Sequence, residues 1–157
     1  MSTKTRTPAT LTPERHAGQP DGAAAPIVFP QGLPGFPGAT SFALRPLTDA
    51  AGELLVLEST EDPELRFLVL PYADHRVPLR RADVDGACAA LGVRPDDAAV
   101  LLVVTSRHEP ESGGMRSQRL YANLRAPLIL DTVRRTAVQH VLASPAYPVR
   151  HCLAAAA

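Results

Sequence analysis

Short runs of apolar residues, separated by proline and turn residues, characterise the chain from residue 26 onward. Residues 100–105 (VLLVVT) form a continuous, β-branched run, which is typical of a strand buried on both faces. Turn residues separate the other runs, which favours strands over helices. We therefore predict further strands over residues 27–29, 41–44, 53–59, 65–70, 120–123, 128–130, 136–142 and 149–153.

A helical pattern stands out between about residues 83 and 91. Asp83 is a candidate cap at its start, and Gly92 follows its end. Its apolar positions fall on one face: Val84, Ala87, Cys88 and Leu91. The fold class predicted from these elements is mainly β. We expect a small barrel-like folded sheet of about seven or eight short strands with one or two short helices.

Two connections interrupt the predicted strands. Residues 26–36 (PIVFPQGLPGF) combine glycine and proline, which predicts a rigid, tight connection that carries Leu33 and Phe36 into the core. Residues 109–114 (EPESGG) are predicted to form an exposed loop between strands.

The two ends of the chain differ from its centre. Residues 1–25 contain only Met1 and Leu11 as large aliphatic side chains, so we expect a disordered tail, as we do for residues 154–157. One domain is then expected over residues 26–153. No apolar run is long enough to span a bilayer, and no apolar stretch follows Lys4 and Arg6, which leads us to expect a cytoplasmic protein.

Composition and charge narrow the function classes. The chain has 16 basic and 16 acidic residues and only 4% aromatic residues, which argues against direct binding of nucleic acid or of an anionic membrane. No phosphate-binding loop or nucleophile motif occurs, so we expect no enzyme and no cofactor. No metal site is expected either, because none of the histidines has a ligand spacing to a second histidine or cysteine: His16, His75, His108, His140 and His151.

One charge cluster has two readings. Residues 53–65 contain five acidic residues and no basic one, with Glu58, Glu61, Asp62 and Glu64 at or near a predicted turn. The cluster is either a soluble turn or an acidic docking surface for a basic partner. A strand edge is a further candidate for partner binding, because it offers backbone groups.

Residues 123–127 (NLRAP) lie between two predicted strands. Asn123 is expected to bond local backbone groups there. Pro127 marks an edge strand or the beginning of a strand.

Several segments, taken in order, resemble the flagellar assembly factor FliW family. They are GLPGF at residues 32–36, LESTEDPELRFLVLP at 57–71, VLLVVT at 100–105, YANLRAPLIL at 121–130, and AVQHVL with SPAYPVRHCL within 137–153. The resemblance covers nearly all of the expected domain. It implies a small β-barrel-like fold. It also adds Tyr147 and Arg150, from the final Y-x-x-R-H pattern, to Asn123, Pro127 and the acidic residues as candidate partner-binding positions.

The resemblance implies a non-enzymatic cytoplasmic regulator, expected to be a monomer when free. FliW-type proteins bind the RNA-binding translational repressor CsrA, which relieves repression of flagellin translation, and they also bind flagellin in a partner switch. Two other functions stay open. One is a flagellin-only chaperone without CsrA regulation, and the other is a small ligand-binding or enzymatic β-barrel.

Overall fold

The structure is a computed structural model that describes residues 25–47 and 53–153. The predicted tails at residues 1–25 and 154–157 lie, apart from Ala25, outside the described residues. Within the described part, nine strands form one sheet, so the predicted mainly β, barrel-like fold is confirmed. The strands are β1 (Ile27–Val28), β2 (Ser41–Pro46), β3 (Leu55–Ser59), β4 (Arg66–Pro71), β5 (Ala98–Pro110), β6 (Arg116–Ala122), β7 (Leu128–Asp131), β8 (Thr136–Gln139) and β9 (His151–Cys152).

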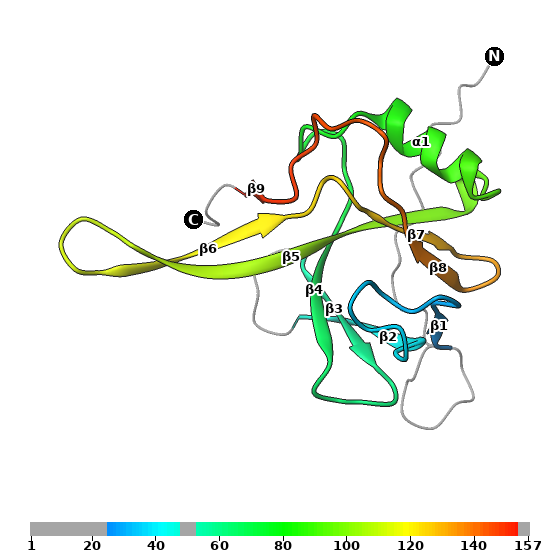
Figure 1. The fold of residues 1–157 in the computed structure, drawn as a ribbon, viewed down its shortest axis with the longest axis horizontal. Coiled ribbons are helices and arrows are strands. Elements are labelled where there is room, and N and C mark those ends of the chain that lie inside the picture. The colour runs from blue at the N-terminus through cyan, green and yellow to red at the C-terminus, as the bar shows by residue number, and fades with distance from the viewer. Residues whose placement is uncertain (1–24, 48–52, 154–157) are drawn as a thin grey trace, which may run out of the picture.

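The sheet closes on itself. Its strand order runs β4-β3-β2-β1-β8-β7-β5-β6-β9, and an additional pairing of β4 with β5 completes a ring. Most neighbours in the ring are antiparallel, but β1 pairs in parallel with β8, through Val28 and Thr136. Closure removes most free strand edges, and Figure 1 shows the ring below the single helix.

Strand β5 is the longest element of the ring. Its first residues pair with β7 and with β4, and the remainder, from Val104 to Pro110, pairs with β6. This second half leaves the barrel as a projecting hairpin (Figure 1). The loop predicted at residues 109–114 was therefore placed too early, because β5 continues to Pro110 and β6 begins only at Arg116. This segment carries no strand pattern, since neither face of the hairpin is buried and its residues do not alternate in polarity.

Helix α1 (Arg81–Ala90) covers one side of the barrel, and the short 3-10 helix η1 (Pro95–Asp97) leads into β5. The helix buries Val84, Ala87 and Cys88, as its apolar face predicts, whereas Leu91 is the C-cap and is only partly buried against the same cluster. Asp83 is not the cap, because the helix begins earlier and Asp83 lies in its first turn, where a carboxylate is favourable next to the helix dipole. No helix in the described residues is long and apolar enough to cross a membrane.

Buried side chains form two clusters on opposite sides of the barrel wall. One cluster fills the barrel and includes Phe29, Phe42 and Leu101. The other packs the outer side of the wall against α1 and the C-terminal segment, and includes Leu102. Because Leu101 and Leu102 are neighbours in different clusters, the centre of β5 is buried on both faces, as its apolar run predicts.

The connection between β1 and β2 is tight, as expected. Gly32 has a φ of 65°, and a Cβ there would lie 2.7 Å from the carbonyl oxygens of Phe36 and Pro37, so only glycine fits. Leu33 is buried, in agreement with the prediction. Phe36 is not carried into the core: it is 43% exposed, and its ring packs edge-on against Phe67.

Candidate functional site

The acidic turn, residues 58–64, joins β3 to β4 and has a firmly bonded backbone. Buried Ser59 accepts hydrogen bonds at its Oγ from the backbone N–H groups of Glu61 (3.2 Å) and Asp62 (3.1 Å). Thr60 fixes the turn to β2, since its N–H donates to the Ser41 carbonyl at 2.9 Å and its hydroxyl to Ser41 Oγ at 2.8 Å. The backbone of the turn is thus held before any partner arrives, which lowers the entropy cost of docking.

Three carboxylates of the acidic turn face solvent. Glu61, Asp62 and Glu64 are exposed, and Asp62 Oδ1 accepts from the Glu64 N–H at 3.0 Å. Among the described residues, no ion pair is recorded for Glu61 or Glu64. Glu58 is half-buried and lies opposite Arg66 in the β3–β4 register. The arrangement can present negative charge to a basic partner at low ordering cost.

Asn123 bonds local backbone groups, as predicted. Its Oδ1 accepts from the N–H groups of Arg125 (3.0 Å) and Ala126 (3.1 Å). The next residue, Leu124, donates its N–H to the carbonyl of Pro148 at 3.0 Å. The segment between β6 and β7 therefore anchors the C-terminal part of the chain.

Tyr147 and Pro127 are buried. The Tyr147 hydroxyl bonds the Asp83 carboxylate and accepts the backbone N–H of Arg80 at 3.4 Å. That hydroxyl holds the pKa of Asp83 below its usual value, and the Arg80 guanidinium, 3.2 Å away, acts in the same direction. Pro127 directly precedes β7 inside the ring, so it marks the beginning of a strand and not an edge. Because both side chains are buried, little of either is accessible to a partner protein, which favours a structural role for both.

The candidate residues fall into two separate regions. Asn123 and Tyr147 lie near the C-terminal segment, where Arg150 is exposed just before β9. The acidic turn lies at the opposite end of the molecule, at the bottom of Figure 1. The fold therefore does not bring the acidic residues together with Asn123, Tyr147 and Arg150.

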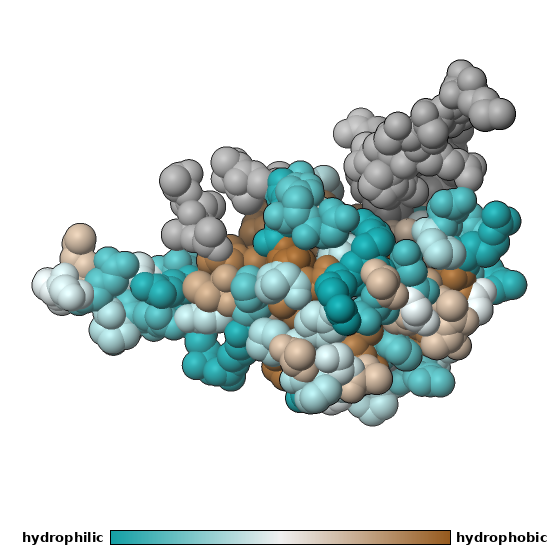
Figure 2. Space-filling view, turned by 90° about the horizontal axis from the view of Figure 1, so that it is seen from above, coloured by the Kyte–Doolittle hydropathy of each residue, from teal (hydrophilic) through white to brown (hydrophobic). Residues whose placement is uncertain are grey.

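The projecting hairpin of β5 and β6 carries charged residues that sequence reasoning missed. Arg107 and Arg119 lie directly opposite each other, which is unfavourable for like charges. Glu109 offsets this by pairing with Arg119 at 3.3 Å and by accepting a hydrogen bond from Tyr121, which raises the pKa of that phenol. Figure 2 shows the hairpin as a mostly hydrophilic projection. Only the register, which the sequence does not display, reveals the opposed arginines.

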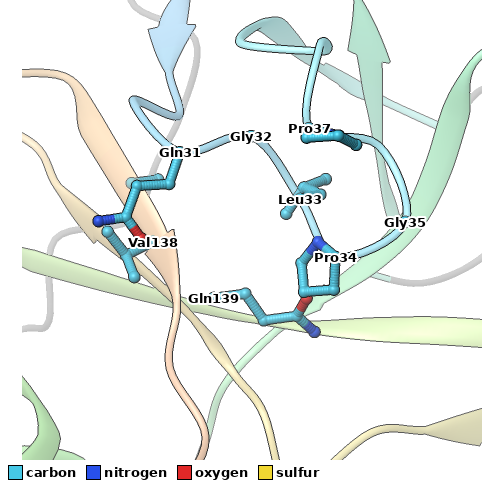
Figure 3. Close-up of a pocket in the computed structure, with 9 residues that line it drawn as sticks. Gln31, Gly32, Leu33, Pro34, Gly35, Pro37, Val138 and Gln139 are labelled. Atoms are coloured by element: carbon cyan, nitrogen blue, oxygen red, sulfur yellow. The ribbon is translucent and has the colours of Figure 1, made fainter.

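The structure offers little for catalysis within the described residues. No group of three or more His, Cys, Asp or Glu side chains there could hold a metal ion. Burial raises the pKa of the Cys88 thiol, which disfavours the reactive thiolate. A hollow of about 280 Å³ lies between β8 and the loop at residues 31–37 (Figure 3), and none of its lining residues is charged. It contains no pair of acid and base groups.

Comparison with known proteins identifies the family. The family model described as "FliW protein" matches residues 12–153. A flagellar assembly factor FliW from Symbiobacterium thermophilum is 32% identical over 127 residues, which cover 80% of this chain and 86% of that protein. Another from Azoarcus sp. is 31% identical over 117 residues, covering 74% of this chain and 79% of that protein.

A solved structure agrees in fold. The crystal structure of a flagellar assembly factor FliW superimposes with a TM-score of 0.61 at 24% sequence identity, and the match covers 81% of this chain and 84% of that chain. The span matched by the family model contains all the described residues, including the acidic turn and the 123–127 segment. The chain belongs to the FliW family.

Proposed function

We propose that the chain is a non-enzymatic regulator of flagellum assembly that binds a CsrA-type RNA-binding repressor and flagellin, one at a time. The family supports the flagellar role, since its relatives are named flagellar assembly factors. The acidic turn supports binding of the repressor. Glu61 and Glu64 are exposed, neither forms an ion pair with another described residue, and Ser59 holds the backbone that carries them. A protein that binds RNA presents basic surface, so its charge is complementary to the turn.

Exclusive binding is sufficient for regulation. The population of each complex, relative to the free regulator, is proportional to the partner's free concentration divided by its Kd. Abundant flagellin therefore withdraws the regulator from the repressor by mass action. Export of flagellin then reverses the exchange. This scheme needs no catalytic group, cofactor or metal. We expect it to take place in the cytoplasm, with the free regulator a monomer that touches neither nucleic acid nor membrane.

A flagellin-only chaperone is the second candidate. The observation that favours it is the formal net charge of zero, which leaves the acidic turn as a local feature without support from the rest of the surface. The two candidates differ only in whether the repressor binds, so one binding experiment separates them.

Charge reversal in the acidic turn tests the proposal. Glu61→Lys with Glu64→Lys is expected to keep the fold, because both side chains are exposed and the bonds of Ser59 use only backbone N–H groups of the turn. Association with a CsrA-type repressor should slow about tenfold or more at low salt, and the difference should shrink near about 0.5 M salt. Stopped-flow measurements across a salt series give both quantities.

The matched control changes the net charge equally at another place. Asp74→Lys with Glu111→Lys also reverses two exposed carboxylates, but these lie outside the acidic turn. The control should slow association much less than the variant of the turn, and both variants should keep flagellin binding. Equal kinetics for the two variants would show that only net charge matters. No repressor binding by the unaltered chain would favour the flagellin-only chaperone.

A further inference from the structure

One edge of β8 is only partly paired. Its other edge is fully paired with β7. Four residue pairs join the two strands, and the His140 N–H donates to the Pro127 carbonyl at 3.0 Å just beyond them. On its β1 side the pairing consists of Val28 with Thr136, where the Val28 N–H donates to the Arg135 carbonyl at 2.9 Å. Backbone groups alternate in direction along a strand, so Ala137 and Gln139 direct theirs toward the β1 side, as Arg135 does.

Proline explains why the β1 ladder stops. Beyond the end of β1, the next backbone nitrogen that would face β8 after Val28 belongs to Pro30, and it carries no hydrogen. The Phe29 N–H points the other way and donates to Thr40 of the β2 side at 2.7 Å. The chain then turns away, with the Gly32 N–H bonded to the Phe29 carbonyl. The Ala137 carbonyl and the Gln139 N–H are left facing the hollow, with no backbone partner recorded among the described residues.

The hollow matches the size and character of a peptide residue. Its volume is about 280 Å³, and Figure 3 shows the loop at residues 31–37 arching beside Val138 and Gln139 of β8. A cavity of about 150 Å³ already holds benzene, so this hollow has room for one peptide residue with an apolar side chain, backbone included. Its walls are mostly apolar and carry no charge. Its polar side chains are the amides of Gln31 and Gln139, and the Gln139 Nε2 already donates to the Ala126 carbonyl at 3.1 Å.

We propose that this hollow, the β8 slot, receives an extended, uncharged segment of a partner protein that adds to β8 as a strand. One residue of such a segment satisfies both free groups, because its N–H donates to the Ala137 carbonyl and its C=O accepts from the Gln139 N–H. A β-branched side chain fits beside Val138 and prefers the extended backbone.

Charge excludes the other classes of occupant. Nucleic acid needs basic residues for its phosphates, and the slot has none. A second copy of this chain would have to offer a free strand, but its exposed hairpin edges carry charged residues such as Arg107 and Arg116, which are costly to bury against neutral walls. The residues that line the slot include none of the acidic turn, so the inference does not depend on the proposed function.

Random heptapeptides displayed on phage are the probe. They are panned against the full-length chain, and enriched peptides are then measured against two variants. Gln31→Trp fills the slot from an exposed loop position, whereas Val133→Trp places the same side chain at a 72% exposed site in the β7–β8 turn. Melting curves check that both variants fold.

The expected consensus is uncharged and rich in β-branched residues. Such peptides should bind the unaltered chain and Val133→Trp equally, and Gln31→Trp at least about tenfold more weakly. They should also slow hydrogen exchange of the Gln139 amide. Absence of enriched peptides, a charged consensus, or equal binding to Gln31→Trp would overturn the proposal. It would also be overturned if a chain beginning at Pro26 bound the peptides much more tightly, since residues 1–25 would then be the natural occupant.

Discussion

Replacing Asn123 with alanine tests whether this side chain holds the fold or contacts a partner. The substitution removes Oδ1, the acceptor for the N–H groups of Arg125 and Ala126 at 3.0 and 3.1 Å. Ala126 is buried and Arg125 is half-buried, so at least one donor would be left without water or protein as a partner. We expect a structural role.

The magnitude follows from these two bonds. A neutral hydrogen bond contributes about 0.5–1.5 kcal/mol net, and the half-buried donor can regain water, so Asn123→Ala should lower the free energy of unfolding by about 1–2 kcal/mol. For a domain of this size the melting temperature should fall by about 3–6 °C. Urea unfolding and thermal melting, followed by circular dichroism, measure both quantities.

Asn123→Asp is the matched control, because aspartate keeps an acceptor oxygen at the same place and should recover most of the lost stability. Flagellin binding by folded Asn123→Ala should remain near that of the unaltered chain. If Asn123→Ala melts like the unaltered chain but fails to bind flagellin, the structural reasoning is refuted and Asn123 is a partner contact.

Two further predictions concern the packing of the chain ends. The Tyr147 hydroxyl lowers the pKa of Asp83 in the folded state. The hydrogen bond therefore stabilises the fold fully above the unfolded-state pKa of about 3.9, and this stabilisation is lost as the pH falls through the lowered folded-state pKa. Tyr147→Phe should therefore be less stable at pH 7, and the difference in urea midpoint should narrow below about pH 4; a constant difference would contradict this coupling. A chain beginning at Pro26 should lose less than about 1 kcal/mol, whereas a larger loss in urea unfolding would mean that residues 1–25 pack as part of the domain.

The sequence predicted most of the strands but not how they close. The apolar run at residues 100–105 correctly marked a strand buried on both faces, because both faces of β5 contribute core residues. The pairings of β4 with β5 and of β1 with β8 join segments far apart in the chain. No local pattern encodes such pairings, so they were not predictable from hydrophobicity alone.

For the candidate site residues too, the sequence predicted local contacts but not contacts between distant segments. Local chemistry predicted that Asn123 would bond its neighbours' backbone, and it does. The burial of Tyr147 depends on helix α1, which lies more than fifty residues earlier, so its sequence motif did not distinguish a contact from a core residue. The β8 slot required the register around Pro30, which only the structure supplies.

A competition measurement tests the central proposal most directly. The CsrA-type repressor of the native host is labelled with a fluorophore, the unaltered chain is added, and flagellin is then titrated at constant salt. We predict a saturable complex with the repressor that flagellin displaces completely, as exclusive binding requires. A complex that persists at saturating flagellin, or no complex with the repressor at all, would contradict the partner switch.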